Sequence, residues 1–144
     1  MILELPSGEL EDAAAMHAAG AMLARQVRAG DRLLLSGDLG AGKTTLVRGL
    51  CVALGVDPDE VASPTFALAH RYEGRDFAIV HADLYRIDDP AELEAAGMLE
   101  TLDDPTVLGI VEWPEVAAHL LAGTPRTAWL RIEMEAGGRR VVPA

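Results

Sequence analysis

The chain has 144 residues, of which 50% are hydrophobic, and this is enough apolar material for one compact domain with an ordinary core. Its 12 Lys and Arg residues stand against 23 Asp and Glu residues, and the resulting net charge of −11 leaves no broad basic surface for nucleic acid. A single cysteine, Cys51, excludes an intrachain disulfide, and the 4 scattered histidines lack the spacing of a structural zinc site.

The start of the chain lacks the basic and then apolar stretch of a secretory signal. No segment reaches the roughly 20 apolar residues that are needed to cross a bilayer. We therefore expect a cytoplasmic protein with no membrane association.

The first predicted elements are a helix, a strand and a second helix. Apolar residues at helical spacing, followed by Gly30, predict a helix over residues 9–28. The apolar run at residues 32–35 is typical of a parallel strand that is buried on both faces. After a glycine-rich turn, the segment 44–54 predicts another helix, which ends at Gly55.

The rest of the chain predicts several strands with short helices between them. These elements are hairpin strands at 65–72 and 77–82, helices at 90–96 and 114–121, a buried strand at 107–111, and strands of a terminal hairpin at 128–135 and 139–142. Strands that alternate with helices in this way predict a single α/β domain over residues 1–144.

The strongest motif lies between the buried strand and the second helix. Residues 37–44 satisfy the pattern GxxxxGK[ST] in the strand, loop and helix context of a phosphate-binding P-loop. Glycines let backbone N–H groups turn toward phosphate oxygens, and the helix N-terminus adds partial positive charge. Lys43, the only lysine, would reach the β- and γ-phosphates, and the Thr44 hydroxyl would ligate Mg²⁺. The predicted nucleotide-binding residues are Gly37, Asp38, Leu39, Gly40, Ala41, Gly42, Lys43, Thr44 and Thr45.

With this loop, the predicted fold is a P-loop NTPase-like three-layer sandwich, with a mostly parallel central sheet and antiparallel additions. ATP fits better than GTP, because translation-type GTPases recognise guanine through an Asn-Lys-x-Asp segment and no lysine other than Lys43 is present. The sequence identifies no contact to the base, although residues 6–9 could cover the adenine. A small-molecule kinase stays open, but its usual arginine-rich lid is missing, since the clustered pair Arg139 and Arg140 lies in the terminal hairpin.

Two acidic residues, Asp83 and Glu112, follow apolar strands, where a P-loop enzyme needs a carboxylate to hold Mg²⁺ or to order the attacking water. Either of them could instead be a surface acid at a strand end. His81 is expected to be a satisfied strand histidine rather than a catalyst. A further segment lies where P-loop proteins often place a loop that senses the γ-phosphate, although it could also be a plain proline turn. Its residues are Ser63, Pro64, Thr65 and Phe66.

Together these segments resemble the TsaE family, the P-loop ATPase component of bacterial tRNA threonylcarbamoyladenosine synthesis. The resemblance runs from residue 6 to about residue 115. Its motifs are GDLGAGKTTLVRGL at residues 37–50, SPTF at 63–66, HADLYR at 81–86 and VEWPE at 111–115.

The resemblance implies an ATPase of low activity when alone, which acts on the partner proteins TsaB and TsaD and meets tRNA only through that complex. It also implies roles for single residues. They are Lys43, Asp83 and Glu112 in catalysis, Thr44 and Glu112 as Mg²⁺ ligands, residues 63–66 as a switch loop, and Arg86 and Trp113 as contacts of the nucleotide or a partner. The alternative is a nucleotide-dependent adaptor that does not need hydrolysis.

Overall fold

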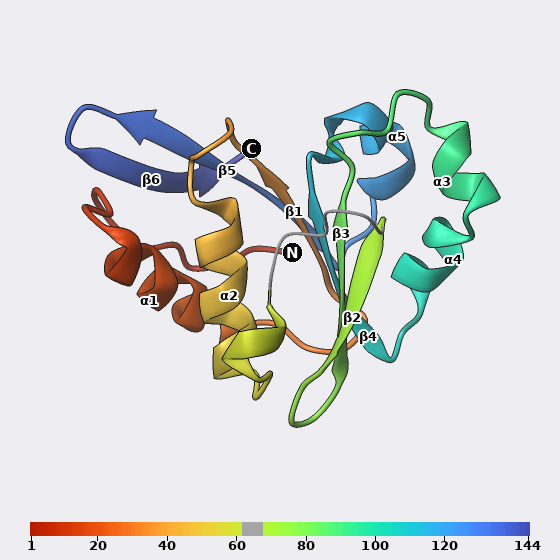
Figure 1. Cartoon of the computed structure of the whole chain (residues 1–144), viewed down its shortest axis with the longest axis horizontal. Helices are drawn as coiled ribbons and strands as arrows, with labels where there is room; N and C mark the ends of the chain where they lie inside the picture. Colours follow the sequence, from red (N-terminus) through yellow and green to blue (C-terminus); the bar gives the residue numbers. More distant parts are fainter. Residues whose placement is uncertain (62–67) are drawn as a thin grey trace.

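The computed structural model describes residues 1–61 and 68–144, and these residues form one six-stranded sheet with helices on both faces (Figure 1). The strands lie in the order β2-β3-β4-β1-β5-β6. Their bounds are β1 Arg32–Ser36, β2 Ala69–Glu73, β3 Ala78–Asp83, β4 Val107–Glu112, β5 Thr127–Glu135 and β6 Gly138–Pro143. The pairs β3–β4, β4–β1 and β1–β5 are parallel, whereas β2 and β6 add antiparallel edges. The predicted mostly parallel sheet with antiparallel additions is thus confirmed.

The helices form the two outer layers of the fold. Helices α1 (Ala13–Ala24) and α2 (Lys43–Ala53) cover one face of the sheet, and α3, α4 and α5 cover the other (Figure 1). The bounds of the remaining helical elements are α3 Ala91–Ala95, α4 Met98–Asp103, α5 Ala118–Leu121, and the 3-10 turns η1 Pro58–Glu60 and η2 Pro114–Ala117. No helix in the described part of the chain is both long and apolar enough to span a membrane.

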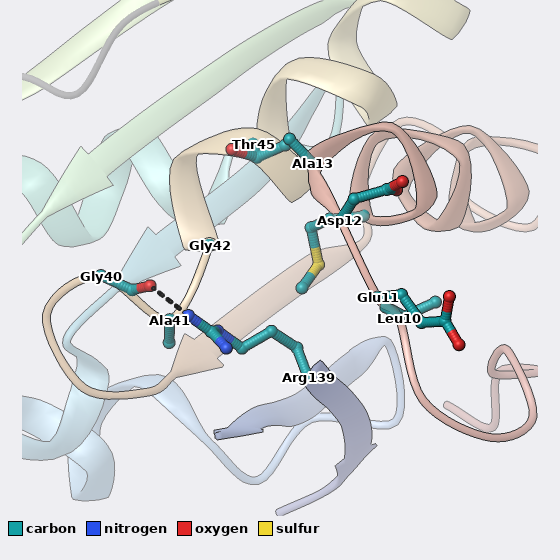
Figure 2. A pocket seen from close by; sticks show the side chains of 10 residues that line it. Leu10, Glu11, Asp12, Ala13, Gly40, Ala41, Gly42, Thr45 and Arg139 are labelled. Carbon is teal, nitrogen blue, oxygen red and sulfur yellow. Dashed lines mark hydrogen bonds between the residues drawn. The ribbon is translucent and has the colours of Figure 1, made fainter. Parts of the chain in front are cut away.

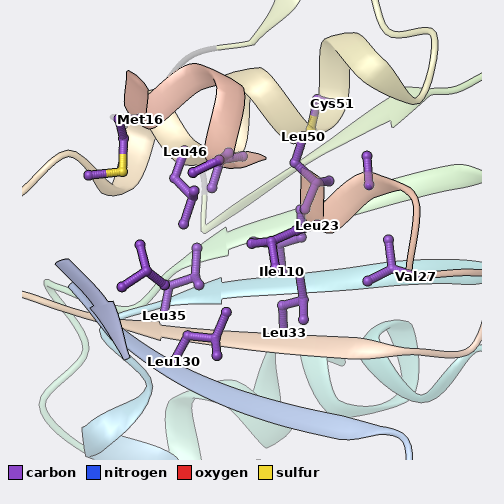
Figure 3. Packing of buried hydrophobic residues seen from close by; sticks show 14 of the residues in the cluster. Met16, Leu23, Val27, Leu33, Leu35, Leu46, Leu50, Cys51, Ile110 and Leu130 are labelled. Atoms are coloured by element: carbon purple, nitrogen blue, oxygen red, sulfur yellow. The ribbon is translucent and has the colours of Figure 1, made fainter. Parts of the chain in front are cut away.

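Strand β1 lies between the two apolar cores, one on each face of the sheet. Side chains on successive strand residues point to opposite faces, so Leu33 and Leu35 enter the core under α1 and α2, whereas Leu34 enters the core on the other face. Figure 3 shows the first of these cores, in which Leu23 and Leu50 from the two helices approach the sheet. The prediction that this strand is buried on both faces is confirmed.

The first helix begins later than predicted, at Ala13 rather than at residue 9. The carboxylate of Asp12 caps it by accepting a hydrogen bond from the Ala15 backbone N–H at 2.8 Å. Leu10 is excluded from the helix because it forms a β-bridge with Arg139, in which the Leu10 N–H donates to the Arg139 carbonyl at 2.6 Å. The contact with a distant strand therefore replaces the first predicted turn.

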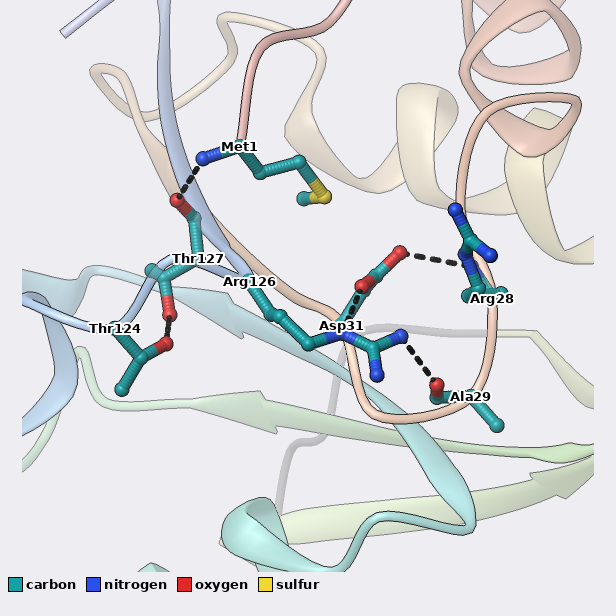
Figure 4. Close-up of polar contacts among 7 residues, drawn as sticks. All are labelled: Met1, Arg28, Ala29, Asp31, Thr124, Arg126 and Thr127. Carbon is teal, nitrogen blue, oxygen red and sulfur yellow. Dashed lines mark hydrogen bonds and ion pairs between the residues drawn. The ribbon is translucent and has the colours of Figure 1, made fainter.

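The first helix also ends early, at Ala24 rather than at residue 28, because the following residues are bound to the N-terminal ends of β1 and β5 (Figure 4). Asp31, which is 4% exposed, accepts hydrogen bonds from the Arg28 backbone N–H and from Arg126 Nε, each at 2.9 Å. Arg126 Nη2 also donates to the carbonyl of Ala29 at 2.8 Å. We call these contacts the Asp31 anchor.

Several other elements differ from the predicted ones. The structure describes β2 from Ala69 onward, and residues 65–67 of the predicted strand lie outside the described residues. The predicted helix at 114–121 consists of η2 followed by α5, because Ala117 between them departs from helical geometry at φ −130° and ψ 27°. The sequence did not predict α4, which starts after Gly97 turns the chain at φ 70°, nor the short turn η1.

Candidate nucleotide-binding site

The glycine-rich loop joins the C-terminal end of β1 to the N-terminus of α2. Gly40 and Gly42 have positive φ values of 80° and 106°, a conformation that other residues rarely adopt. Around the first of them the loop turns tightly, and the Ala41 N–H donates to the Asp38 carbonyl at 3.0 Å. Gly42 also lies against Met16 of α1, whose Cε would be 3.2 Å from any Cβ at this position. The two glycines therefore give the loop both its turns and its fit against α1.

Lys43 points back into the loop, where its side chain is buried. Its Nζ donates to the Gly37 carbonyl, and to the Asp38 carbonyl at 3.3 Å. It also lies 4.0 Å from the centroid of the Trp113 ring, within the range of a cation–π contact. Burial lowers the pKa of the Lys43 ammonium, and the charge of Glu112 partly opposes this effect.

Asp83 and Glu112 end neighbouring parallel strands and face each other in register. Burial raises the pKa of the Asp83 carboxyl, the Tyr85 backbone N–H that it accepts at 3.0 Å lowers it, and the charge of Glu112 raises it further. Both acids line a cavity of 320 Å³ together with Lys43 and Thr44. The structure thus brings the predicted phosphate-binding and metal-binding residues to one place.

A metal ion in this cavity would have only part of its ligands from the protein. Among residues 1–61 and 68–144, no three His, Cys, Asp or Glu side chains come together as a ready metal cage. A site with few protein ligands suits Mg²⁺, because this ion is usually held by one or two carboxylates and by substrate phosphates. The Glu112 carboxylate and the Thr44 hydroxyl, both at the cavity wall, are donors of the right kind.

Trp113 closes one side of this cavity in a constrained conformation. It is the one non-glycine residue with positive φ in the part of the chain that the structure describes. Its backbone N–H donates to the Leu35 carbonyl at 3.3 Å, and its ring packs against Tyr85 with 5.0 Å between the centroids. Arg86, which the sequence proposed for the same region, is exposed and is not among the described residues that line this cavity.

A second cavity, of 230 Å³, lies on the other side of the loop (Figure 2). It shares Gly40, Ala41, Gly42 and Thr45 with the first cavity, and its further walls are Leu10, Glu11, Asp12, Ala13, Met16 and Arg139. The Arg139 guanidinium donates to the Gly40 carbonyl at 3.5 Å. The segment 6–9, expected to cover the adenine, is not among the lining residues, and the four residues after it are.

Arg139 lines the second cavity, although the sequence analysis did not place it at the candidate site. The terminal hairpin carries it to the loop because its backbone pairs with Leu10. No signal in the neighbouring sequence indicates this contact, because it depends on the pairing of two distant segments.

The predicted switch loop, Ser63 to Phe66, lies outside the described residues. The last described residue before it, Val61, accepts a hydrogen bond from Arg48 Nη2 at 2.7 Å. Arg48 also lines a cavity of 500 Å³ with His17, Thr44 and Thr45. Val61 therefore lies beside α2, the helix that begins at the glycine-rich loop.

Comparison with known proteins relates most of the chain to one family. The profile of the family described as "Threonylcarbamoyl adenosine biosynthesis protein TsaE" matches residues 10–142. Curated proteins with the name tRNA threonylcarbamoyladenosine biosynthesis protein TsaE are similar to the chain. The protein from Mycobacterium leprae is 41% identical over 120 residues, which are 78% of this chain and 72% of the relative.

Two further relatives of the same name give similar values. The protein from Streptomyces coelicolor is 45% identical over 103 residues, which are 69% of this chain and 68% of the relative. The protein from Rickettsia conorii is 36% identical over 120 residues, which are 83% of this chain and 66% of the relative. The matches thus span about two thirds of the relatives' own length.

Among solved structures, the crystal structure of YdiB from Bacillus subtilis has the same fold. Its TM-score is 0.71 at 23% identity, and the match covers 98% of this chain and 84% of that one. This likeness supports the predicted P-loop-like fold.

Proposed function

Since the chain belongs to the TsaE family and so to tRNA threonylcarbamoyladenosine biosynthesis, we propose that its task there is to bind ATP with Mg²⁺ and to hydrolyse it slowly. One observation carries this proposal. A glycine-rich loop at a helix N-terminus, a buried lysine and two carboxylates from adjacent strands surround one cavity.

Each part of the cavity suits one part of a nucleoside triphosphate. Backbone N–H groups of the loop and of the first turn of α2 would bind phosphate oxygens, and Lys43 would neutralise the charge of the β- and γ-phosphates. Thr44 and Glu112 would hold Mg²⁺, which neutralises charge that develops on the transferred phosphoryl group. Asp83, whose pKa is raised by burial, would orient the attacking water.

The second cavity is the proposed place of the adenine. It begins where the phosphate cavity ends, at Gly42 and Thr45, and Leu10, Met16 and Ala13 give it apolar walls. The Arg139 guanidinium at its edge is suited to stack on a flat base. The terminal hairpin would then be part of the nucleotide site.

We further propose that the protein acts on TsaB and TsaD and meets tRNA only through them. The net charge of −11 supports an indirect role, because a surface of this charge repels the phosphates of RNA. A basic patch on a partner protein would complement it.

The test is phosphate release from Mg²⁺·ATP, with modified tRNA measured in the same samples that also contain TsaB, TsaD, tRNA and the threonylcarbamoyl-adenylate donor. We expect Lys43→Ala to reduce phosphate release by about 100-fold. The control Arg25→Ala, which removes an exposed cation away from the cavity, should stay within about twofold of the wild type.

The outcomes separate the proposed function from its alternatives. Repeated rounds of tRNA modification that need both the wild-type protein and hydrolysable ATP would support the ATPase. Repeated rounds with a non-hydrolysable analogue would show an adaptor instead. A metabolite that raises ADP production while phosphate release stays constant would show a small-molecule kinase.

A further inference from the structure

Three polar side chains form a chain of hydrogen bonds across the sheet, from its edge strand to the candidate metal ligand. The Tyr72 hydroxyl lies 3.1 Å from His81 Nδ1, and His81 Nε2 lies 2.5 Å from Glu112 Oε2. The exposed fractions of the three residues are 3%, 0% and 2% in this order. Water therefore has almost no access to these contacts, and the side chains must satisfy one another.

The register of the strands explains why these residues meet. His81 pairs with Ile110, so Glu112 is two residues further along β4 and on the same face of the sheet. Tyr72 pairs with Ile79, two residues before His81, and again shares its face. The three side chains thus follow one diagonal across β2, β3 and β4.

Donor and acceptor atoms can be assigned consistently along these two hydrogen bonds. An ionised carboxylate can only accept, so His81 Nε2 must carry the hydrogen that points to Glu112. In a neutral imidazole the other nitrogen then accepts, and the Tyr72 hydroxyl can donate to it. Glu112 thereby selects the tautomer of the His81 ring, and Tyr72 helps to hold its orientation.

We propose that His81 is a positioning residue, held by Tyr72, which fixes the Glu112 carboxylate for binding of the metal–nucleotide complex. This proposal rests on the proposed function, because it assigns Glu112 to Mg²⁺. His81 occupies Oε2 and so leaves Oε1 as the oxygen for the cavity that Glu112 lines. Partners of this kind orient metal ligands in many proteins, and their loss typically costs 10- to 100-fold in metal affinity.

Three variants and two binding conditions test the proposal. His81→Leu removes the donor, His81→Gln keeps an N–H near the position of Nε2, and Tyr72→Phe removes only the hydroxyl. The affinity for fluorescently labelled ATP is measured by titration, first with a metal chelator and then at increasing Mg²⁺ concentrations. The affinity for ATP without metal measures binding by the glycine-rich loop. The Mg²⁺ concentration that gives the half-maximal effect measures the contribution of Glu112 as a metal ligand.

We expect His81→Leu to keep the metal-free affinity for ATP within about twofold of the wild type. It should raise the half-maximal Mg²⁺ concentration by about 10- to 100-fold. His81→Gln should restore most of this loss. Tyr72→Phe should cause a smaller rise of about fivefold, the typical effect of one lost hydrogen bond. A residue that only maintains the core would instead change both affinities together.

A double mutant shows whether His81 acts through Glu112. In a Glu112→Gln background, His81→Leu should cause no further change in Mg²⁺ dependence. Unchanged Mg²⁺ dependence in His81→Leu, or in Tyr72→Phe if His81→Leu does not fold, would overturn the positioning role alone. Absence of ATP binding by the wild-type protein would overturn the proposed function as well.

Discussion

Lys43 carries the only ammonium side chain of the protein into a place that little water reaches. Two loop carbonyls and the Trp113 ring replace part of its lost hydration. Its pKa is lowered all the same, so burial of this charge has a cost in the structure without a ligand. A nucleotide phosphate would offer the same ammonium a stronger partner.

Burial likewise favours the neutral form of Cys51, a second titratable group in the core. Burial raises the pKa of its thiol from the ordinary 9.0 to about 12. Below pH 9 the folded and the unfolded chain both keep the thiol proton. At higher pH the unfolded chain loses it first, so the stability that this group contributes falls as the pH rises from 9 toward 12.

We therefore expect the free energy of unfolding to fall between pH 8 and pH 10 by about 1 kcal/mol more in the wild type than in Cys51→Ala. Urea denaturation at both pH values measures this difference. Because each protein is compared with itself at the two pH values, the stability that Cys51→Ala loses through its cavity cancels. Equal pH dependence in the two proteins would contradict the prediction.

At the scale of elements, α1 and α2 pack with their backbones in direct contact. A Cβ on Gly20 would lie 2.2 Å from the Leu46 carbonyl oxygen, and one on Gly49 would lie 2.0 Å from the His17 carbonyl oxygen. Both distances are far below van der Waals contact, so these positions admit no side chain while the helices keep their spacing. This close packing places Met16 of α1 against the loop at Gly42.

Gly49→Ala should lower the free energy of unfolding by about 2 kcal/mol or more, because the helices must move apart. The direction of the stability change tests the packing argument, because a Gly→Ala substitution inside an exposed helix raises stability by about 1 kcal/mol. Thermal and urea denaturation measure it. The control Ala18→Ser, at an exposed position of α1, should change stability by no more than about 0.5 kcal/mol, and a Gly49→Ala protein as stable as this control would refute the packing argument.

In the whole molecule, the two ends of the parallel strands have different tasks. The candidate nucleotide site lies at the C-terminal ends, where ligands of open α/β sheets bind. The Asp31 anchor lies at the N-terminal ends of β1 and β5 and ties the end of α1 to them (Figure 4). Stability and ligand binding can therefore be altered separately.

Asp31→Ala should lower the free energy of unfolding by about 2 kcal/mol, because it leaves the Arg28 N–H and the Arg126 guanidinium without this acceptor. The affinity for ATP should stay within about twofold, since the substitution lies at the opposite end of the sheet. Denaturation and nucleotide titration on the same samples check both expectations. A large loss of affinity in a folded Asp31→Ala protein would show that the two ends are coupled.

The sequence predicted the parts of the site that depend on short segments. The loop pattern around Lys43 needs only its own glycines and the strand and helix beside it. Asp83 and Glu112 were identified because each follows an apolar strand, and parallel neighbouring strands end at one edge of the sheet. The order of strands and helices likewise predicted the three-layer fold.

Contacts between distant segments were decided by the tertiary structure. Leu10 reads as helical from its neighbours, but pairing with Arg139 removes it from α1 and builds the second cavity. His81 reads as a satisfied histidine, but only the register of β2, β3 and β4 shows that its partners are Tyr72 and Glu112. The glycine-rich loop and the class of fold could be predicted from the sequence, because backbone conformation and side-chain periodicity are local properties. Which distant side chains complete the candidate site is visible only in the folded chain, because strand register and helix packing depend on the energy of the whole core.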